Sequence, residues 1–144
     1  MFSQRVKDVM ERTKLLTAPP ETTVSKAAKL MAKRKVGAVM VVRRKSLVGI
    51  FTERDIVVRI LAKGRDARTT PLADVMTTSP QTVNPGKSFG YALLVMHENG
   101  IRHLPVVENG KLIGIVSARN ALDPDLEEFT AESRRREGIL RERD

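Results

Sequence analysis

The sequence predicts an α/β (α+β) fold made of tandem repeats, each a β-α-β-β-α unit, packed as a pseudo-twofold pair. Three observations support this fold class: a repeat at a spacing of 65 residues, paired apolar stripes of helical period, and paired runs of short strands. We predict a first unit at 5–63, a linker at 64–71, a second unit at 72–123 and a charged C-terminal helix or tail at 124–144.

Two similar stretches carry the repeat most clearly. GIFTERD begins at Gly49, and GIVSARN begins 65 residues later at Gly114, with a hydroxyl residue three positions after each glycine. The tripeptide DVM occurs at 8–10 and again at 74–76. Self-similarity at a fixed spacing indicates a repeated structural unit, and one unit of about 60 residues would have only a marginal core. We therefore expect the two copies to pack against each other.

One helix in each copy follows from the spacing of apolar residues. Positions i, i+3, i+4 and i+7 are apolar in both copies: Val24, Ala27, Ala28 and Met31, then Phe89, Ala92, Leu93 and Met96. Thr23 and Ser88 precede these stripes as N-caps, and Gly100 follows the second stripe as a C-cap.

Short β-branched runs follow each helix. AVMVV and LVGIF form the first pair, and LPVV and LIGIV form the second pair, which is joined by the hairpin turn Asn109-Gly110. A helix after the first pair has Val57, Ile60 and Leu61 on its buried face and ends at Gly64. Each copy is thus predicted to read short helix, short strand, helix, strand, strand, helix.

Composition narrows the function classes. The 144 residues contain no cysteine, which excludes disulfides, thiolate metal sites and cysteine catalysis and fits a reducing cytoplasm. The first ten residues lack the apolar core of a secretion signal, and no apolar run has the roughly 20 residues that span a bilayer. We find no metal-ligand spacing, nucleophile elbow, GxGxxG or Walker loop, so the sequence predicts neither a metal site nor an enzyme.

Charge is distributed unevenly along the chain. Of the formal net charge of +9, residues 1–71 contribute +11, from 17 Lys or Arg and 6 Asp or Glu, while residues 72–123 contribute zero and residues 124–144 contribute −2. A cationic half keeps a nucleic-acid-binding protein open as an alternative. Few aromatic residues for base stacking and no helix-turn-helix pattern make nucleic acid the less favoured partner.

The stretch Thr52-Glu-Arg-Asp55 has two interpretations. It approximates a capping box, in which a hydroxyl and an acid three residues later close a helix N-terminus. The same geometry presents free N–H groups to a phosphate, and an acceptor-only carboxylate can take both hydroxyls of a ribose. The two interpretations are compatible, because a cap can also bind. Gly49 before this stretch would let a backbone or a ligand approach closely.

Taken together, the two copies resemble the CBS domain pair, also called a Bateman module, over about residues 5–122. The resemblance rests on four motifs in each copy: VKDVM and LADVM, TAPP and TVNP, VGAVMVV and IRHLPVV, and LVGIFTERDIV and LIGIVSARNAL. It implies a regulatory rather than catalytic module with two clefts between the domains. These clefts bind adenosine-type ligands such as AMP, ADP or ATP, and sometimes S-adenosylmethionine or dinucleotides.

The resemblance also assigns roles to individual residues. Asp55 would hold the ribose, with Thr52 and Arg54 near the phosphate. The rest of the first site would be Thr17, Ala18, Val36, Gly37 and Ala38. The matching second site would be Thr82, Val83, Ile101, Arg102, His103, Ser117, Arg119 and Asn120. Asn120 departs from the family pattern, since a neutral amide cannot accept from both ribose hydroxyls as a carboxylate can.

The function that we expect is a stand-alone sensor that binds an adenine nucleotide and signals its occupancy to a regulated protein whose identity is unknown. We also expect a homodimer, formed through the helices that follow the two signature stretches, and no catalytic cofactor. The remaining alternative is a dimerising scaffold whose clefts bind no ligand.

Overall fold

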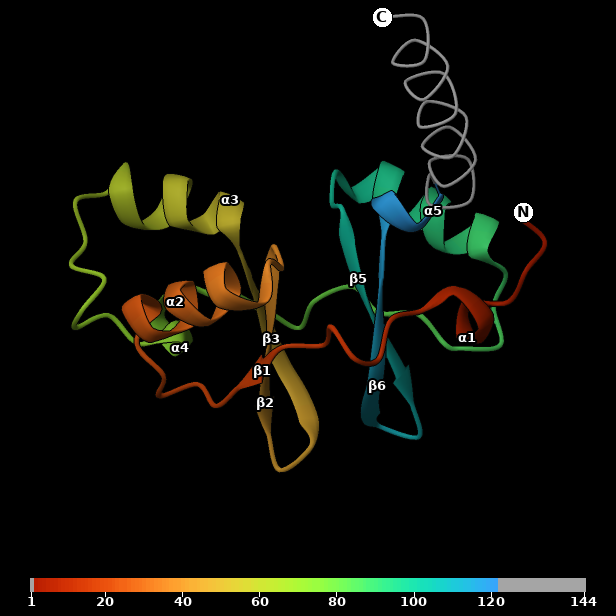
Figure 1. Ribbon diagram of the computed structural model, residues 1–144, viewed down its shortest axis with the longest axis horizontal. Helices are drawn as coiled ribbons and strands as arrows, with labels where there is room; N and C mark the ends of the chain where they lie inside the picture. Colours follow the sequence, from red (N-terminus) through yellow and green to blue (C-terminus); the bar gives the residue numbers. More distant parts are fainter. Residues whose placement is uncertain (1, 122–144) are drawn as a thin grey trace, which may run out of the picture.

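The computed structural model describes residues 2–121, so the helix predicted at 124–144 lies outside the described residues. The chain forms two halves that stand side by side (Figure 1). Their sheets face each other in the middle of the molecule, and the longer helices lie on the outer sides. The predicted α/β class and the two-copy arrangement are confirmed.

The first half is built around a four-stranded sheet of order β1-β2-β3-β4, in which only β1 and β2 run parallel. Its elements are β1 (Thr17–Ala18), α2 (Val24–Arg34), β2 (Ala38–Arg43), β3 (Ser46–Thr52), α3 (Glu53–Asp55), the π-helix η1 (Ile56–Leu61), α4 (Leu72–Val75) and β4 (Thr77–Thr78).

The second half repeats this plan around the hairpin of β5 and β6. Its elements are α1 (Val6–Val9), α5 (Phe89–Asn99), β5 (His103–Glu108), β6 (Lys111–Ser117) and the 3₁₀ turn η2 (Ala118–Ala121). Single bridges replace the short outer strands, because Val83 pairs parallel with Val106 and Glu11 pairs antiparallel with Ile115. Both central hairpins carry a register shift at equivalent places, between Val41 and Val42 and between Val106 and Val107.

The long helices begin and end as the sequence predicts. The Thr23 hydroxyl accepts from the backbone N–H of Lys26 at 3.3 Å, and the Ser88 hydroxyl accepts from that of Tyr91 at 3.1 Å. Gly100 ends α5 in the left-handed conformation with φ 63°. Lys35 ends α2 in the same conformation with φ 57°, although a residue with a Cβ rarely adopts it.

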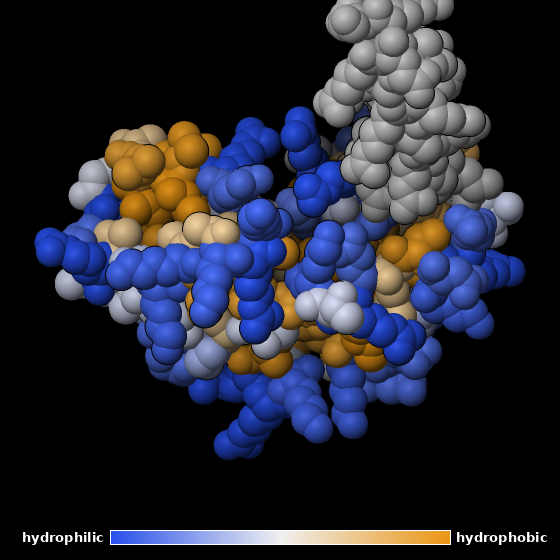
Figure 2. Space-filling view, in the orientation of Figure 1, coloured by the Kyte–Doolittle hydropathy of each residue, from blue (hydrophilic) through white to orange (hydrophobic). Residues whose placement is uncertain are grey.

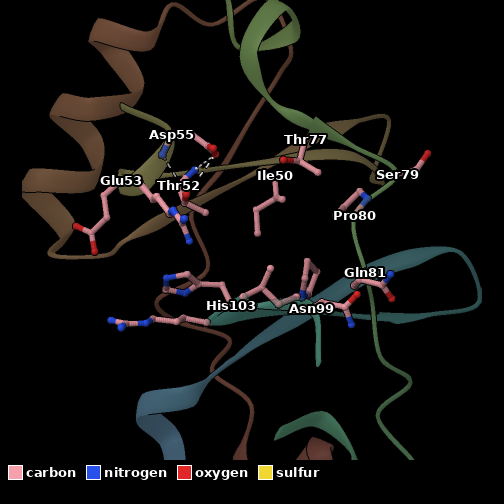
Figure 3. A pocket seen from close by; sticks show the side chains of 15 residues that line it. Ile50, Thr52, Glu53, Asp55, Thr77, Ser79, Pro80, Gln81, Asn99 and His103 are labelled. Carbon is pink, nitrogen blue, oxygen red and sulfur yellow. Dashed lines mark hydrogen bonds between the residues drawn. The ribbon is translucent and has the colours of Figure 1, made fainter. Parts of the chain in front are cut away.

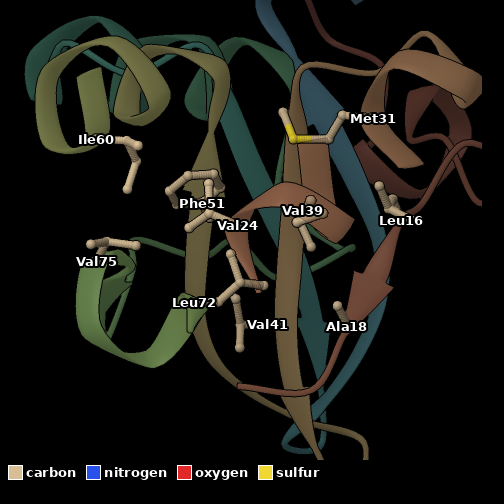
Figure 4. Close-up of a cluster of buried hydrophobic side chains, with 11 residues drawn as sticks. Leu16, Ala18, Val24, Met31, Val39, Val41, Phe51, Ile60, Leu72 and Val75 are labelled. Carbon is tan, nitrogen blue, oxygen red and sulfur yellow. The ribbon is translucent and has the colours of Figure 1, made fainter. Parts of the chain in front are cut away.

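Strand β2 is buried on both faces, which explains its unbroken apolar sequence. Val39 and Val41 face the first core, together with Phe51 and the inner face of α2 (Figure 4). Ala38 and Met40 face the other way and pack with Ile50 in a cluster that reaches the second half through Leu112 and Ile115. This middle cluster joins the two sheets, and burying one such large apolar side chain stabilises the fold by about 1.5–3 kcal/mol.

The short helices are exchanged between the halves. Val6 of α1 is fully buried in the second core, and its N–H donates to the carbonyl of Lys87 at 2.8 Å. Leu72 and Val75 of α4 are buried in the first core instead. Figure 1 shows α1 beside β6 and α4 beneath α2. Each repeat in the sequence therefore lends its first helix to the other repeat's fold.

The helix after β3 differs from the prediction. Its hydrogen bonds run from i+5 to i, since Ala62 N–H donates to the Val57 carbonyl at 2.9 Å, and this wider winding does not follow the 3.6-residue period. Only Ile60 is buried, while Val57 and Leu61 are 59% and 70% exposed. Together with Val58 they form what we call the η1 patch, the apolar area at the upper left of Figure 2.

Candidate functional site

A cleft of about 530 Å³ lies between the two halves, and we call it the first cleft. Its side chains form two facing walls (Figure 3). One wall comes from the end of β3, α3 and the segment after α4: Ile50, Thr52, Glu53, Arg54, Asp55, Thr77, Ser79, Pro80 and Gln81. The other wall comes from the end of α5 and the start of β5: Asn99, Gly100, Ile101, Arg102, His103 and Pro105. A cleft of this size, with apolar walls and a few polar groups, suits a small-molecule ligand.

Asp55 combines a capping role with a place in the first cleft. Its Oδ2 accepts from the Thr52 N–H at 2.9 Å and from the Thr52 hydroxyl at 3.2 Å, and its own N–H donates to that hydroxyl at 3.4 Å. The predicted capping box is thereby confirmed. Oδ1 lies 3.4 Å from Arg59 Nε. A carboxylate offers about four acceptor positions, so Oδ1 retains capacity for a ligand hydroxyl.

His103 and Glu53 both lie beside Gly37, in the wall that the two clefts share. A Cβ at Gly37 would lie 2.9 Å from Glu53 Oε1 and 3.3 Å from His103 Nε2, so a side chain there would displace the Glu53 carboxylate. Burial lowers the pKa of His103 below its usual 6.5; Glu53 opposes this shift, and Arg119 and Arg102 reinforce it. The imidazole is therefore neutral at pH 7 until an anion approaches it.

A second cleft, of about 810 Å³, lies beside the first. It is lined by Ala28, Met31, Ala32, Lys35, Val36, Gly37, Glu53, Ile56, Arg102, His103, Ser117, Ala118 and Arg119. Three of these residues, Glu53, Arg102 and His103, also line the first cleft. The two clefts are therefore neighbours with a common wall.

The position equivalent to Asp55 in the second copy is held by Asn120. Its Oδ1 accepts from the Ser117 N–H at 2.7 Å and from the Ser117 hydroxyl at 3.2 Å, which reproduces the cap. Its Nδ2 donates to Glu11 Oε1 at 3.2 Å. The residue equivalent to Glu11 is Thr77, because Glu11 bridges to Ile115 just as Thr77 pairs with Ile50.

The clefts mix residues that the sequence grouped by copy. Thr52, Arg54 and Asp55 line the first cleft together with Ile101, Arg102 and His103 of the other copy. Val36 and Gly37 line the second cleft together with Ser117 and Arg119. The pseudo-twofold arrangement causes this exchange, since the strand end of one copy faces the helix-to-strand turn of the other.

Several predicted site residues lie elsewhere. Ala38, Ala18 and Val83 are 4–6% exposed and belong to the hydrophobic clusters. Thr17 and Thr82 are exposed and, like those three residues and Asn120, line neither cleft. The strand geometry accounts for the buried three, whose side chains turn toward the helices or toward the opposite sheet.

Sequence reasoning missed the segment that runs from β4 toward Thr82. Thr77, Ser79, Pro80 and Gln81 line the first cleft, a few residues upstream of the Thr82 that the motif alignment favoured. Ser79 has φ 46°, and this left-handed residue bends the chain beside the cleft. The signal available in the sequence was the DVM tripeptide, which ends just before this segment.

The glycines of the two signature stretches make room for methionines rather than for a ligand. A Cβ at Gly49 would overlap the side chain of Met76, and one at Gly114 would lie 2.8 Å from Met10 Sδ. Backbone also approaches closely there, because Thr77 O and Glu11 O would lie 3.0 and 3.2 Å from these Cβ positions. The DVM and GI motifs repeat together because they pack on each other.

Within residues 2–121, no cluster of three or more His, Cys, Asp or Glu could hold a metal ion. In the same part of the chain, no helix combines the length and the apolar character needed to cross a bilayer.

Known proteins are similar to this chain in sequence and in fold. The chain is 42% identical over 112 residues to the CBS domain-containing protein YhcV of Bacillus subtilis, covering 78% of this chain and 79% of that protein. It spans about a fifth of the longer CBS domain-containing protein CBSCBSPB1 of Arabidopsis thaliana, with 37% identity.

Solved structures agree with this comparison. An uncharacterised conserved protein from Pyrococcus horikoshii superposes with a TM-score of 0.80 at 31% identity, covering 87% of this chain and 94% of that one. The CBS domain protein PAE2072 from Pyrobaculum aerophilum, whose structure is a complex with AMP, superposes with a TM-score of 0.73 at 29% identity, covering 81% and 88%. The CBS domain model matches this sequence twice, at 6–62 and 72–125, and the chain therefore belongs to the CBS domain family.

Proposed function

We propose that this CBS pair is a regulatory module that binds an adenine nucleotide in the first cleft and passes the occupancy of that cleft to a partner protein. The observation that carries the proposal is the pairing of an acceptor with cations across one cleft: Asp55 on one wall, Arg54 beside it and Arg102 on the other. A related protein of similar fold is complexed with AMP, which supports the same ligand class.

The residues of the first cleft suit the three parts of a nucleotide. Ile50, Pro80, Ile101 and Pro105 offer apolar surface for the base, and the amides of Asn99 and Gln81 offer donors and acceptors for its edge. Oδ1 of Asp55 can accept a ribose hydroxyl. Arg54 and Arg102 can bind phosphate oxygens through charge-assisted hydrogen bonds. In this proposal the ligand is bound and released unchanged.

Calorimetry with adenosine, AMP, ADP and ATP tests the proposal. Adenosine should bind at least about tenfold more weakly than AMP, because a lost charged contact typically costs about 1.5–3 kcal/mol. GMP serves as the control for the base. Equal affinities for adenosine and AMP would contradict the role of the arginines, and absence of binding by all four ligands would overturn the proposal.

We also propose that two copies associate through the η1 patch. Val57, Val58 and Leu61 expose 47–70% of their surface on one helix, which is an unusual concentration of apolar side chains for a solvated surface. A second copy presents the same patch, so a twofold contact would cover both at once.

A further inference from the structure

The two clefts differ at the position that Asp55 holds in the first cleft. In the first cleft, Asp55 and Thr77 both line the cavity. In the second copy the equivalent residues, Asn120 and Glu11, hydrogen-bond to each other at 3.2 Å, and neither lines the second cleft. The amide at the position of the ribose acceptor is therefore engaged within the protein, and it has no second oxygen to offer a ribose.

The remaining part of the second cleft is more cationic than the first. Among the described residues that line it, Lys35, Arg102 and Arg119 face one carboxylate, that of Glu53, for a formal balance of +2. In the first cleft Arg54 and Arg102 face Glu53 and Asp55, so the balance is 2 − 2 = 0. None of the three ion pairs recorded among residues 2–121 uses Lys35, Arg102 or Arg119.

Lys35 is present at a position that disfavours a lysine. It has φ 57°, whereas the equivalent residue of the second copy is Gly100, with φ 63°. A glycine adopts this conformation without strain, and a lysine does not. A cation therefore lies at the edge of the second cleft although the backbone conformation at this position favours a glycine.

We infer that the second cleft is a polyphosphate site without a nucleoside pocket. Because Glu53, Arg102 and His103 line both clefts, an extended polyanion can run from one to the other. The polyphosphate is either the outer phosphates of a nucleotide whose base and ribose occupy the first cleft or a free inorganic polyphosphate. The first source rests on the proposed function, and the second does not.

The test uses the full chain, inorganic tripolyphosphate, AMP and ATP, with calorimetry as the readout. Lys35→Gly removes the cation and relieves the left-handed backbone. Lys45→Gly is the matched control, because Lys45 also has a positive φ, of 69°, and lies at the β2–β3 turn outside both clefts. Thermal melts should show that both variants fold.

We expect Lys35→Gly to weaken tripolyphosphate binding at least about tenfold, as one charge-assisted contact is lost, and to leave AMP binding unchanged. Lys45→Gly should change neither. If the source is a nucleotide, ATP will bind more tightly than AMP, will lose this advantage in Lys35→Gly and will compete with tripolyphosphate. If the source is free polyphosphate, tripolyphosphate will bind to AMP-saturated protein while ATP binds no more tightly than AMP.

Two results would overturn the inference: equal effects of the two lysine substitutions on tripolyphosphate binding, or a second equivalent of AMP bound per chain. If the parent protein binds tripolyphosphate and no AMP, the proposed nucleotide function fails while the polyphosphate site stands. If it binds AMP and no tripolyphosphate, and ATP gains nothing over AMP, the polyphosphate site fails while the nucleotide function stands.

Discussion

Asp55 and Asn120 show at the scale of single residues that a helix cap and a ligand acceptor can be separated. The cap oxygen accepts from the backbone N–H of residue 52 at 2.9 Å in one copy and of residue 117 at 2.7 Å in the other. Both caps also accept from a hydroxyl at 3.2 Å. An amide oxygen therefore closes the same turn that a carboxylate closes.

Asp55→Asn should accordingly keep the fold and lose the ligand. Asn and Asp are about equally good caps, and the lost ion pair with Arg59 is partly exposed, so the free energy of unfolding should change by less than about 1 kcal/mol. AMP and ATP affinity should fall roughly tenfold to a hundredfold. Calorimetry and thermal melts on the same samples measure both effects. Unchanged binding with a collapsed melting point would make Asp55 a cap alone.

Asn120→Asp would place at this position the acid that the family pattern has there, but we expect it to lower the stability of the fold. The new carboxylate would lie about 3 Å from Glu11 Oε1, where an amide donates at present. Two adjacent carboxylates repel each other and raise the pKa of one of them. We expect a lower melting point at pH 7 that recovers as the pH falls. The double variant Asn120→Asp with Glu11→Thr should recover at pH 7; equal melting points of the two variants would contradict this account.

His103 makes stability and binding depend on pH in opposite directions. Its folded pKa lies below 6.5, so its contribution to stability is fully present above pH 6.5 and is lost as the pH falls through the window below that value. A phosphate beside the imidazole, near Glu53, Arg102 and Arg119, would raise the pKa again. ATP binding near pH 6 should therefore take up a proton at His103.

Calorimetry in two buffers of different ionisation enthalpy measures that proton uptake. The His103→Gln variant is the control, because it retains the titration of the terminal phosphate itself. Equal proton uptake by the parent and by His103→Gln would exclude the histidine as the titrating group.

At the scale of elements, the features that could be predicted from the sequence are those set by residues close together in the chain. Val24, Ala27 and Met31 are buried along α2 as their spacing requires, and Phe89, Ala92 and Met96 are buried along α5. The Asn109-Gly110 turn forms with both residues at positive φ. These features follow from residues within one or two turns of each other.

What the sequence did not predict depends on contacts between the copies. Helices α1 and α4 have four residues each, and their apolar pattern is the same whichever core buries them. The exchange of these helices between the halves therefore could not be predicted from the local sequence. The composition of the clefts could not be read for the same reason, because each wall comes from a different copy. Glu11 was missed since its role appears only through Asn120, 109 positions away.

Met76 of the second DVM tripeptide packs on Gly49 of β3, and this contact gives a testable prediction. Gly49→Ala would place a Cβ 2.8 Å from Met76 Cγ and 3.0 Å from Thr77 O, and β3 and β4 would have to separate. Overpacking of this kind typically destabilises by about 1–3 kcal/mol. Denaturant unfolding measures the loss. Met76→Ala in the same chain should relieve part of it, so strictly additive losses in this double-mutant cycle would contradict the contact.

At the scale of the whole molecule, the two basic runs of the first copy lie apart in the part of the chain that the structure describes. Lys33, Arg34 and Lys35 lie at the end of α2, close to the start of β2, while Arg44 and Lys45 lie beyond the other end of that strand. Arg43 pairs with Glu21 at 2.6 Å. This separation favours local anion binding over a single continuous track for nucleic acid.

The η1 patch predicts how the whole molecule associates. The double substitution Val57→Glu with Leu61→Glu should convert a dimer into a monomer, because burying two carboxylates in an apolar contact is unfavourable. The fold should persist, since both side chains are exposed within one chain. Light scattering at micromolar concentration measures the mass. Lys63→Glu, an exposed change of charge just after η1, should leave the dimer intact; a monomeric parent protein would rule out the assembly.

The exchange of α1 and α4 between the halves also determines when each hydrophobic core can form during synthesis. The first core needs Leu72 and Val75, so it is complete only after α4 has been made. The second core waits for the end of β6, yet it is closed by Val6, which is made more than a hundred residues earlier. Helix α1 must therefore remain undocked while the residues between it and β6 are added. A truncation that removes α1 would uncover the core of the later half and leave that of the earlier half closed.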